Sequence, residues 1–186
     1  MMYLFLIPVS TISLIVPDVC RAIFDKLKRE NYLKTPKTTS EWIHVAKGYE
    51  ENWNFPHCIG ALDGKHIVMQ APKDSGSYYY NYEHCHSVVL LALVDAIYKL
   101  LYMDVGCNGR VSDDGVFSTC VLFPALEQGH LDIPLPNPLP VKEKDTPYGI
   151  TEDDAFTMKS YLMKPYPFNN QPGPNRVFNY RLFRTR

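Results

Sequence analysis

The chain has 186 residues, of which 46% are hydrophobic and 13% aromatic, and its formal net charge is −1. This length suits one ordinary domain with extensions, and the apolar content is enough for a packed core, which excludes an intrinsically disordered chain. A net charge so close to zero also excludes a globally basic nucleic-acid binder. Positive charge is nevertheless concentrated late in the sequence, where four arginines occur with no acidic residue between them: Arg176, Arg181, Arg184 and Arg186.

The cysteine and histidine pattern argues against disulfides and against a structural zinc site. The five cysteines are odd in number, widely spaced and never in a Cys-x-x-Cys pair, which predicts free thiols in a reducing compartment. His84-Cys85-His86 suggests a pair of zinc ligands, but no matching pair occurs elsewhere in the sequence. We therefore expect structural roles for these side chains.

The chain opens with an apolar run, Met1 to Val16, that resembles a signal peptide or a membrane anchor. The run has no basic start, contains Pro8 and ends at Pro17-Asp18, short of the roughly 20 apolar residues that cross a bilayer. Apolar residues recur at three- and four-residue spacing over Ser10–Leu33. We therefore expect a helix there, with a break and restart at Pro17-Asp18, and a signal peptide is the alternative.

A second amphipathic stretch predicts a helix that is capped by Thr39 or Ser40 and continues through Tyr49. We assign both helices to a helical N-terminal extension over residues 1–52. From His57 onward the hydrophobic period changes, which indicates a different structural region over residues 53–186.

Three strands are predicted next, at Cys58–Gln70, Ser87–Asp95 and Lys99–Gly106. The short interval between the second and the third fits a hairpin turn. The sequence Ser112-Asp-Asp-Gly then predicts the start of a helix that ends near Gly129.

The remaining segments complete an α/β order. Proline-rich Asp132–Pro147 predicts a loop without regular pairing, and a short strand should run into Asp153. A short helix is predicted over Phe156–Met163, then a linker over Tyr166–Asn175, then a helix from Arg176 onward. Strands followed by helices in this order predict an α/β fold with a mixed sheet and flanking helices.

Two aspartates stand where these strands end. Asp63 interrupts the apolar first strand, and Asp153 follows the short extended segment much later in the chain. A carboxylate leaving an apolar strand is costly unless a cation or hydrogen bonds compensate its charge. We therefore expect the two carboxylates to converge, about 4 to 7 Å apart, around a shared hard divalent cation.

At these residues the chain resembles a known family, the DDE nuclease domain of PIF/Harbinger transposases and of transposase-derived nucleases of animals. The resemblance runs from Trp53 to about Tyr180 in ordered blocks. The matching stretches are Trp53–Ile67, Ser87–Ala96, Tyr102–Gly106, Gly109–Phe117, Glu152–Phe156, Tyr161–Pro167 and Phe178–Leu182.

The resemblance implies a ribonuclease H-like fold in which two aspartates and one glutamate bind two Mg²⁺ or Mn²⁺ ions, and a domain over residues 53–186. It makes Asp63 the first metal ligand and catalytic residue, and Asp153 the second. Relatives have glycine where this chain has Glu152, which should add a charge beside the site. The family's glutamate falls beyond Arg186, so the chain should lack part of the family domain and have impaired nuclease activity.

Two alternatives to an active nuclease remain open. The chain can be a non-catalytic, domesticated remnant that serves as a protein- or DNA-binding scaffold, or an incomplete product of a degraded element. The same resemblance implies that the chain is shortened at both ends relative to complete family members.

Several other charged residues are secondary candidates for the site. Asp113 and Asp154 are auxiliary ligand candidates, although Asp113 with Asp114 can equally cap a helix, as can Asp153 with Asp154. His66 should point away from the face of the strand that carries Asp63, as a core or supporting histidine.

The partners follow from the resemblance and from the basic cluster. Arg176, Arg181, Arg184 and Arg186 are candidate contacts for the DNA backbone, and a solvated helix start is their alternative reading. The resemblance implies DNA as a partner, a Myb-like DNA-binding protein as a second partner, and location in the nucleus, or in the cytoplasm without that partner. No membrane association is expected.

Overall fold

The computed structural model describes residues 6–30, 32–140, 142–167, 169 and 171–186. The chain divides into two compact units, Met1–Lys34 and Thr35–Arg186, which are considered separately. Helix α3, in the predicted extension, lies in the second unit together with the sheet. The boundary between residues 52 and 53 as the start of a nuclease domain stays a prediction.

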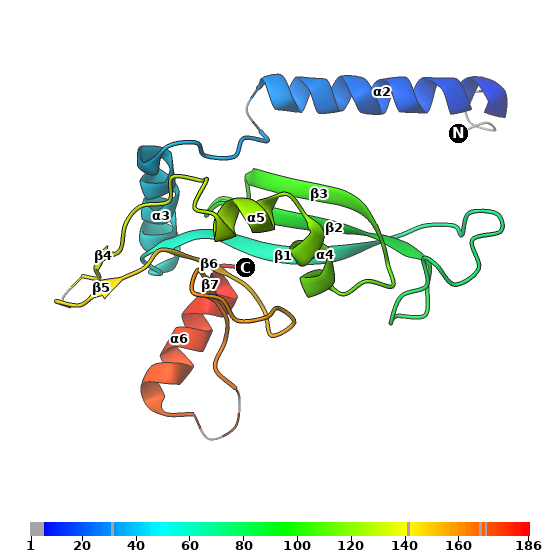
Figure 1. Cartoon of the computed structure of the whole chain (residues 1–186). Helices are drawn as coiled ribbons and strands as arrows, with labels where there is room; N and C mark the ends of the chain where they lie inside the picture. The colour runs from blue at the N-terminus through cyan, green and yellow to red at the C-terminus, as the bar shows by residue number, and fades with distance from the viewer. Residues whose placement is uncertain (1–5, 31, 141, 168, 170) are drawn as a thin grey trace. The chain divides into compact units, whose positions relative to one another are not determined.

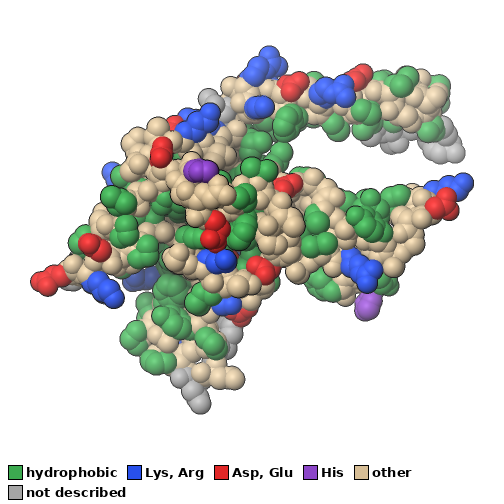
Figure 2. All heavy atoms as spheres, in the orientation of Figure 1, with side chains coloured by type: hydrophobic (Ala, Val, Ile, Leu, Met, Phe, Trp, Pro, Cys, Tyr) green, Lys and Arg blue, Asp and Glu red, His purple; other side chains and the backbone are tan. Residues whose placement is uncertain are grey.

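In the described part of the first unit, Val9–Arg29 form helix α2. The helix continues through Pro17, so the predicted break there is wrong. A proline in a helix interior removes one hydrogen-bond donor and costs about 3 kcal/mol, but the long helical runs on both sides bridge that single gap. Hydrophobic side chains stand at the surface along α2 (Figure 2). No described helix is long and apolar enough to cross a membrane.

The second unit is built on a five-stranded mixed sheet with strand order β3-β2-β1-β6-β7 (Figure 1). β1 pairs antiparallel with β2 and parallel with β6, and the parallel pairing continues to β7. The predicted α/β class with a mixed sheet and flanking helices is therefore confirmed. The strands are β1 Cys58–Val68, β2 Ser87–Val94, β3 Leu100–Asn108, β6 Gly149–Thr151 and β7 Leu162–Met163.

Helix α3, Thr39–Trp53, packs against β1 and supplies part of the core. Its cap is Thr38, whose hydroxyl accepts from the Glu41 amide at 3.3 Å, so the predicted cap at Thr39 or Ser40 is one or two residues late. The Tyr49 hydroxyl donates to the Val94 carbonyl at 2.8 Å, which ties the helix to the end of β2. The helix continues past Tyr49 to Trp53. It ends there because Asn54, with φ of 52°, adopts the left-handed conformation.

The single helix predicted between Ser112 and Gly129 is two helices. α4 covers Asp113–Thr119 and α5 covers Leu122–Glu127, with Cys120 extended between them at ψ of 161°. Pro124 explains the break, because its ring would clash with the Cys120 carbonyl if one helix ran through both residues.

Two further predictions are corrected by short strands. The proline-rich loop contains β4, Asn137–Pro138, paired antiparallel with β5, Asp145–Thr146; the pairing stops after two residues because prolines lack the amide donor. Val141, in the same predicted loop, lies outside the described residues. The helix predicted over Phe156–Met163 is replaced by a turn and β7. The strand forms because the edge of β6 needs hydrogen-bond partners. The Ile150 and Glu152 amides donate to the carbonyls of residues 161 and 163, at 2.8 and 3.0 Å.

Helix α6, Gly173–Arg184, begins before the predicted start at Arg176, with Pro174 in its first turn, where a missing amide donor costs nothing. Leu182 is fully buried and Asn179 is 4% exposed, so one side of α6 packs on the unit. Phe168 and Asn170 of the predicted linker lie outside the described residues. The C-terminal end of α6 lies beside β6 and β7 (Figure 1).

Candidate active site

Asp63 and Asp153 are delivered to one place by two neighbouring parallel strands. In the β1–β6 ladder, Ala61 pairs with Thr151, and each aspartate follows its paired residue by two positions. Residues two apart on a strand point to the same face, and parallel strands run in the same direction. The two carboxylates therefore leave the sheet at adjacent points.

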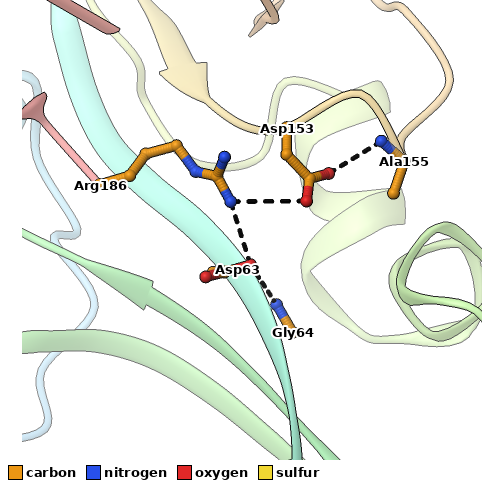
Figure 3. A network of polar contacts seen from close by, with 5 residues as sticks. All are labelled: Asp63, Gly64, Asp153, Ala155 and Arg186. Carbon is orange, nitrogen blue, oxygen red and sulfur yellow. Dashed lines mark hydrogen bonds and ion pairs between the residues drawn. The ribbon is translucent and has the colours of Figure 1, made fainter. Parts of the chain in front are cut away.

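One nitrogen of Arg186 contacts both acids (Figure 3). Its Nη2 lies 3.2 Å from Asp63 Oδ1 and 3.5 Å from Asp153 Oδ2. These two oxygens cannot be farther apart than the sum of those distances, so the predicted convergence of the carboxylates is present. Asp63 is 63% exposed, Asp153 34% and Arg186 17%, which places the arginine deepest of the three.

Local backbone amides orient each carboxylate. Asp63 Oδ1 accepts from the Gly64 amide at 3.0 Å, and Asp153 Oδ1 accepts from the Ala155 amide at 2.8 Å (Figure 3). Such short-range bonds limit the rotation of the carboxylates and hold them in place before any ligand binds.

Asp113 is the third acid near this point. Its carboxylate lies over Gly64, where an added Cβ would stand 2.1 Å from Asp113 Oδ1, and that oxygen is buried with no hydrogen-bond partner among the described residues. Burial raises the pKa of Asp113, and the negative charges of Asp153 and Asp63 raise it further. No three described His, Cys, Asp or Glu side chains are arranged to ligate one metal ion, so Asp113 is a close neighbour and not a formed third ligand.

The remaining acidic candidates have different surroundings. The cap of α4 is Ser112, whose hydroxyl accepts from the Gly115 amide at 3.3 Å, and Asp113 and Asp114 follow in the first turn. Asp114 accepts from the amide and the hydroxyl of Thr157, at 3.0 and 2.8 Å, and so ties α4 to the segment after Asp153. Asp154 is exposed and lines a surface groove, and its auxiliary role stays a prediction.

His66 is directed at β2 and supports the neighbouring strands. Its Nδ1 lies 2.9 Å from the Ser87 hydroxyl oxygen, to which the Asn81 amide also donates at 3.0 Å. This network explains the supporting position expected from the alternation of β1.

Glu152 behaves differently from the sequence expectation. The side chain is fully buried, and neither carboxyl oxygen has a hydrogen-bond partner among the described residues. Burial raises its pKa to about 8, against the opposing effect of the Lys164 cation. The added charge predicted beside the site is therefore largely absent at neutral pH, because the carboxyl group stays protonated.

The four arginines have different surroundings. Arg176 is exposed, Arg181 lines a cavity of about 560 Å³ beside α6, and the Arg184 guanidinium carbon lies 5.7 Å from the centre of the Trp53 ring. Arg186 alone reaches the aspartates. Sequence reasoning missed this contact, because nothing in the local pattern indicates which strand the end of α6 meets.

Asp63 lies inside β1, paired with Ala92 of β2, and not at a strand end as the sequence predicted, whereas Asp153 follows the last residue of β6 by two positions. A mixed sheet flanked by helices, with these two acids side by side on adjacent parallel strands, is consistent with a ribonuclease H-like nuclease fold. The chain belongs to the DDE superfamily endonuclease family, whose match covers residues 62–186 and includes both aspartates. The chain is also similar to Protein ALP1-like of Arabidopsis thaliana, with 28% identity over 153 residues. That match covers 81% of this chain and 37% of the relative, so the chain spans little more than a third of that protein. No solved structure matches significantly.

Proposed function

We propose that this chain is a nuclease domain that binds a divalent cation between Asp63 and Asp153 and acts on phosphodiester bonds of DNA. The observation that carries the proposal is the convergence of both carboxylates on one positively charged nitrogen. Carboxylate oxygens are the ligands that Mg²⁺ and Mn²⁺ prefer. The family match supports the reaction class, because DDE endonucleases use divalent metal ions.

The residues present fit such an ion in part. Asp63 and Asp153 already compensate a cation, and the unpartnered Asp113 Oδ1 adds negative potential nearby. When bound, Mg²⁺ or Mn²⁺ supplies Lewis-acid polarisation of a phosphodiester and lowers the pKa of a bound water. The chain's own contribution is to hold the two carboxylates, each fixed by a backbone amide, side by side on adjacent parallel strands.

The DNA contacts are proposed on charge alone. Arg176 is exposed, and Arg181 and Arg184 lie on the same helix, so a DNA backbone along α6 would meet several cations. Kinship with the PIF/Harbinger group and with animal nucleases rests on the motif blocks described above, as do a Myb-like partner and a nuclear location. These stay predictions.

The decisive experiment is nicking of supercoiled plasmid DNA with Mn²⁺, with EDTA as the blank. We expect nicking that is lost in Asp63→Asn and in Asp153→Asn but kept in Asp145→Asn. The last variant is a matched control, because it removes the same charge from an exposed residue of β5 that is not a candidate ligand. Nicking that survives in Asp63→Asn and Asp153→Asn would contradict the proposal.

A second candidate function is a DNA- or protein-binding scaffold without catalysis. It is favoured by one observation, the lack of a third ligating side chain among the described residues. If the chain binds plasmid and Mn²⁺ but never nicks the plasmid, the scaffold function is favoured over the nuclease.

A further inference from the structure

The Arg186 guanidinium occupies the position where the proposed cation would bind. Its Nη2 contacts one oxygen of each aspartate, and its side chain is only 17% exposed (Figure 3). A guanidinium carries one positive charge and five donors in a planar fork, so here it stands in for a cation of higher charge.

The position of Arg186 is set by the residue before it. Thr185 is 2% exposed, its hydroxyl donates to the Leu182 carbonyl at 2.7 Å, and it lies 3.5 Å from the Thr151 hydroxyl. Thr151 belongs to β6, two residues before Asp153. The end of α6 is therefore anchored to the strand that delivers one of the two acids, and the next residue, Arg186, contacts both acids.

The arginine is well placed but incompletely bonded. Its Nε is buried and has no hydrogen-bond partner among the described residues. A buried donor without a partner carries a desolvation penalty, which lowers the cost of moving the guanidinium elsewhere. Arg186 is thus held by the anchoring of α6 and by two ionic contacts, without a full set of hydrogen bonds.

The charges of the two carboxylates and of the guanidinium determine how strongly the site attracts a divalent ion. Two carboxylates and one guanidinium leave a net charge of one negative unit, which attracts a divalent cation less than the bare pair does. A divalent ion bound to the same oxygens would also lie within a few ångströms of the guanidinium and be repelled by it. The guanidinium and the divalent ion therefore compete for the same carboxylate oxygens.

We propose that Arg186 is a displaceable counter-ion, which holds Asp63 and Asp153 together in the metal-free protein and competes with the divalent metal for them. This inference rests on the proposed function, because it assumes that the pair binds a metal. It adds that metal loading requires the guanidinium to leave, so the end of α6 controls the metal affinity of the site.

The test is Mn²⁺ binding to the full metal-free chain, measured by isothermal titration calorimetry. Even with the screening of bulk water, removal of a cation this close should tighten Mn²⁺ binding by roughly tenfold or more in Arg186→Gln. Arg186→Lys keeps the charge and should stay within about threefold of wild type. Arg184→Gln is the matched control, since it removes the same charge two residues earlier, at the last residue of α6, where Arg184 faces Trp53 and Tyr180.

Circular dichroism in EDTA first establishes that each variant is folded, and Arg186→Met, which keeps the aliphatic stem, replaces Arg186→Gln if the latter unfolds. Tighter binding confined to the Arg186 variants that lose the charge supports the inference. If the wild type binds Mn²⁺ and Arg186→Gln or Arg186→Met binds it no more tightly, the inference is overturned and the metal site is not. A chain whose wild type and charge-loss variants all fail to bind Mn²⁺ overturns both the inference and the metal site.

Discussion

The carboxylate of Asp113 lies against the α-carbon of Gly64, so that a Cβ at residue 64 would be 2.1 Å from Asp113 Oδ1 and 2.3 Å from its Cγ. This close approach places the first turn of α4 directly over the residue that follows Asp63 in β1. Any larger residue at position 64 would therefore have to displace the Asp113 side chain, beside the candidate active site.

Gly64→Ala should destabilise the second unit by about 1 to 3 kcal/mol, because the new methyl group forces the Asp113 carboxylate away from β1. Urea unfolding measures the loss. The double variant Gly64→Ala/Asp113→Gly lacks the clashing carboxylate. Its free energy of unfolding should therefore be close to that of Asp113→Gly alone. Additive losses in the double variant would show that the two residues do not contact each other in solution.

Glu152 should make folding stability depend on pH. Its folded pKa, about 8, lies above the ordinary carboxyl value, so the folded chain keeps a proton that the unfolded chain loses. The stabilisation is complete at pH below about 4.5 and is lost as pH rises toward 8, with a slope of at most about 1.4 kcal/mol per pH unit.

Glu152→Gln should remove this part of the pH dependence, because the amide never ionises. Urea midpoints between pH 5 and 9, all in EDTA, test the effect, with Glu83→Gln as an exposed control. Parallel curves for wild type and Glu152→Gln would mean that the Glu152 carboxyl is not buried in the folded protein.

Thiol reactivity should separate the cysteines by burial. Cys58 is fully buried and its pKa is raised to about 12 by that burial, whereas Cys20 is exposed on α2. At pH 8 the folded chain should alkylate at Cys20 within minutes and at Cys58 only on unfolding, since the thiolate is the reactive form. Peptide mass mapping after a short iodoacetamide pulse reports both sites, and prompt labelling of Cys58 would contradict the position of β1 in the core.

Asn179 should stabilise the docking of α6. It accepts from the Tyr166 amide at 2.8 Å and donates to the Tyr166 carbonyl at 2.9 Å, while itself only 4% exposed. Asn179→Ala leaves both backbone groups without these bonds and should cost about 2 to 3 kcal/mol. Asn175→Ala, in the first turn of the same helix and less buried, should cost under about 1 kcal/mol. Equal losses in the two variants would show that the contact with Tyr166 contributes nothing.

Much of the sheet was readable from local pattern. The apolar runs of β1, β2 and β3 and the turn at Asp95, whose Oδ1 accepts from the Lys99 amide at 2.8 Å, are properties of neighbouring residues. The break between α4 and α5 was not predicted, although Pro124 is a local signal for it. The two aspartates were found because an acid that interrupts or follows an apolar run is easily recognised in a linear sequence.

Other features depend on contacts between distant segments, and no local pattern encodes those. β7 forms instead of a helix because β6 presents unpaired amides to it, and Glu152 is neutral because folding removes its carboxyl from water. Arg186 looks like an ordinary surface cation in the sequence, and it lies between Asp63 and Asp153 only because α6 ends against β6. Local propensity thus accounts for β1, β2, β3 and the two acids, while long-range packing determined which cation those acids meet.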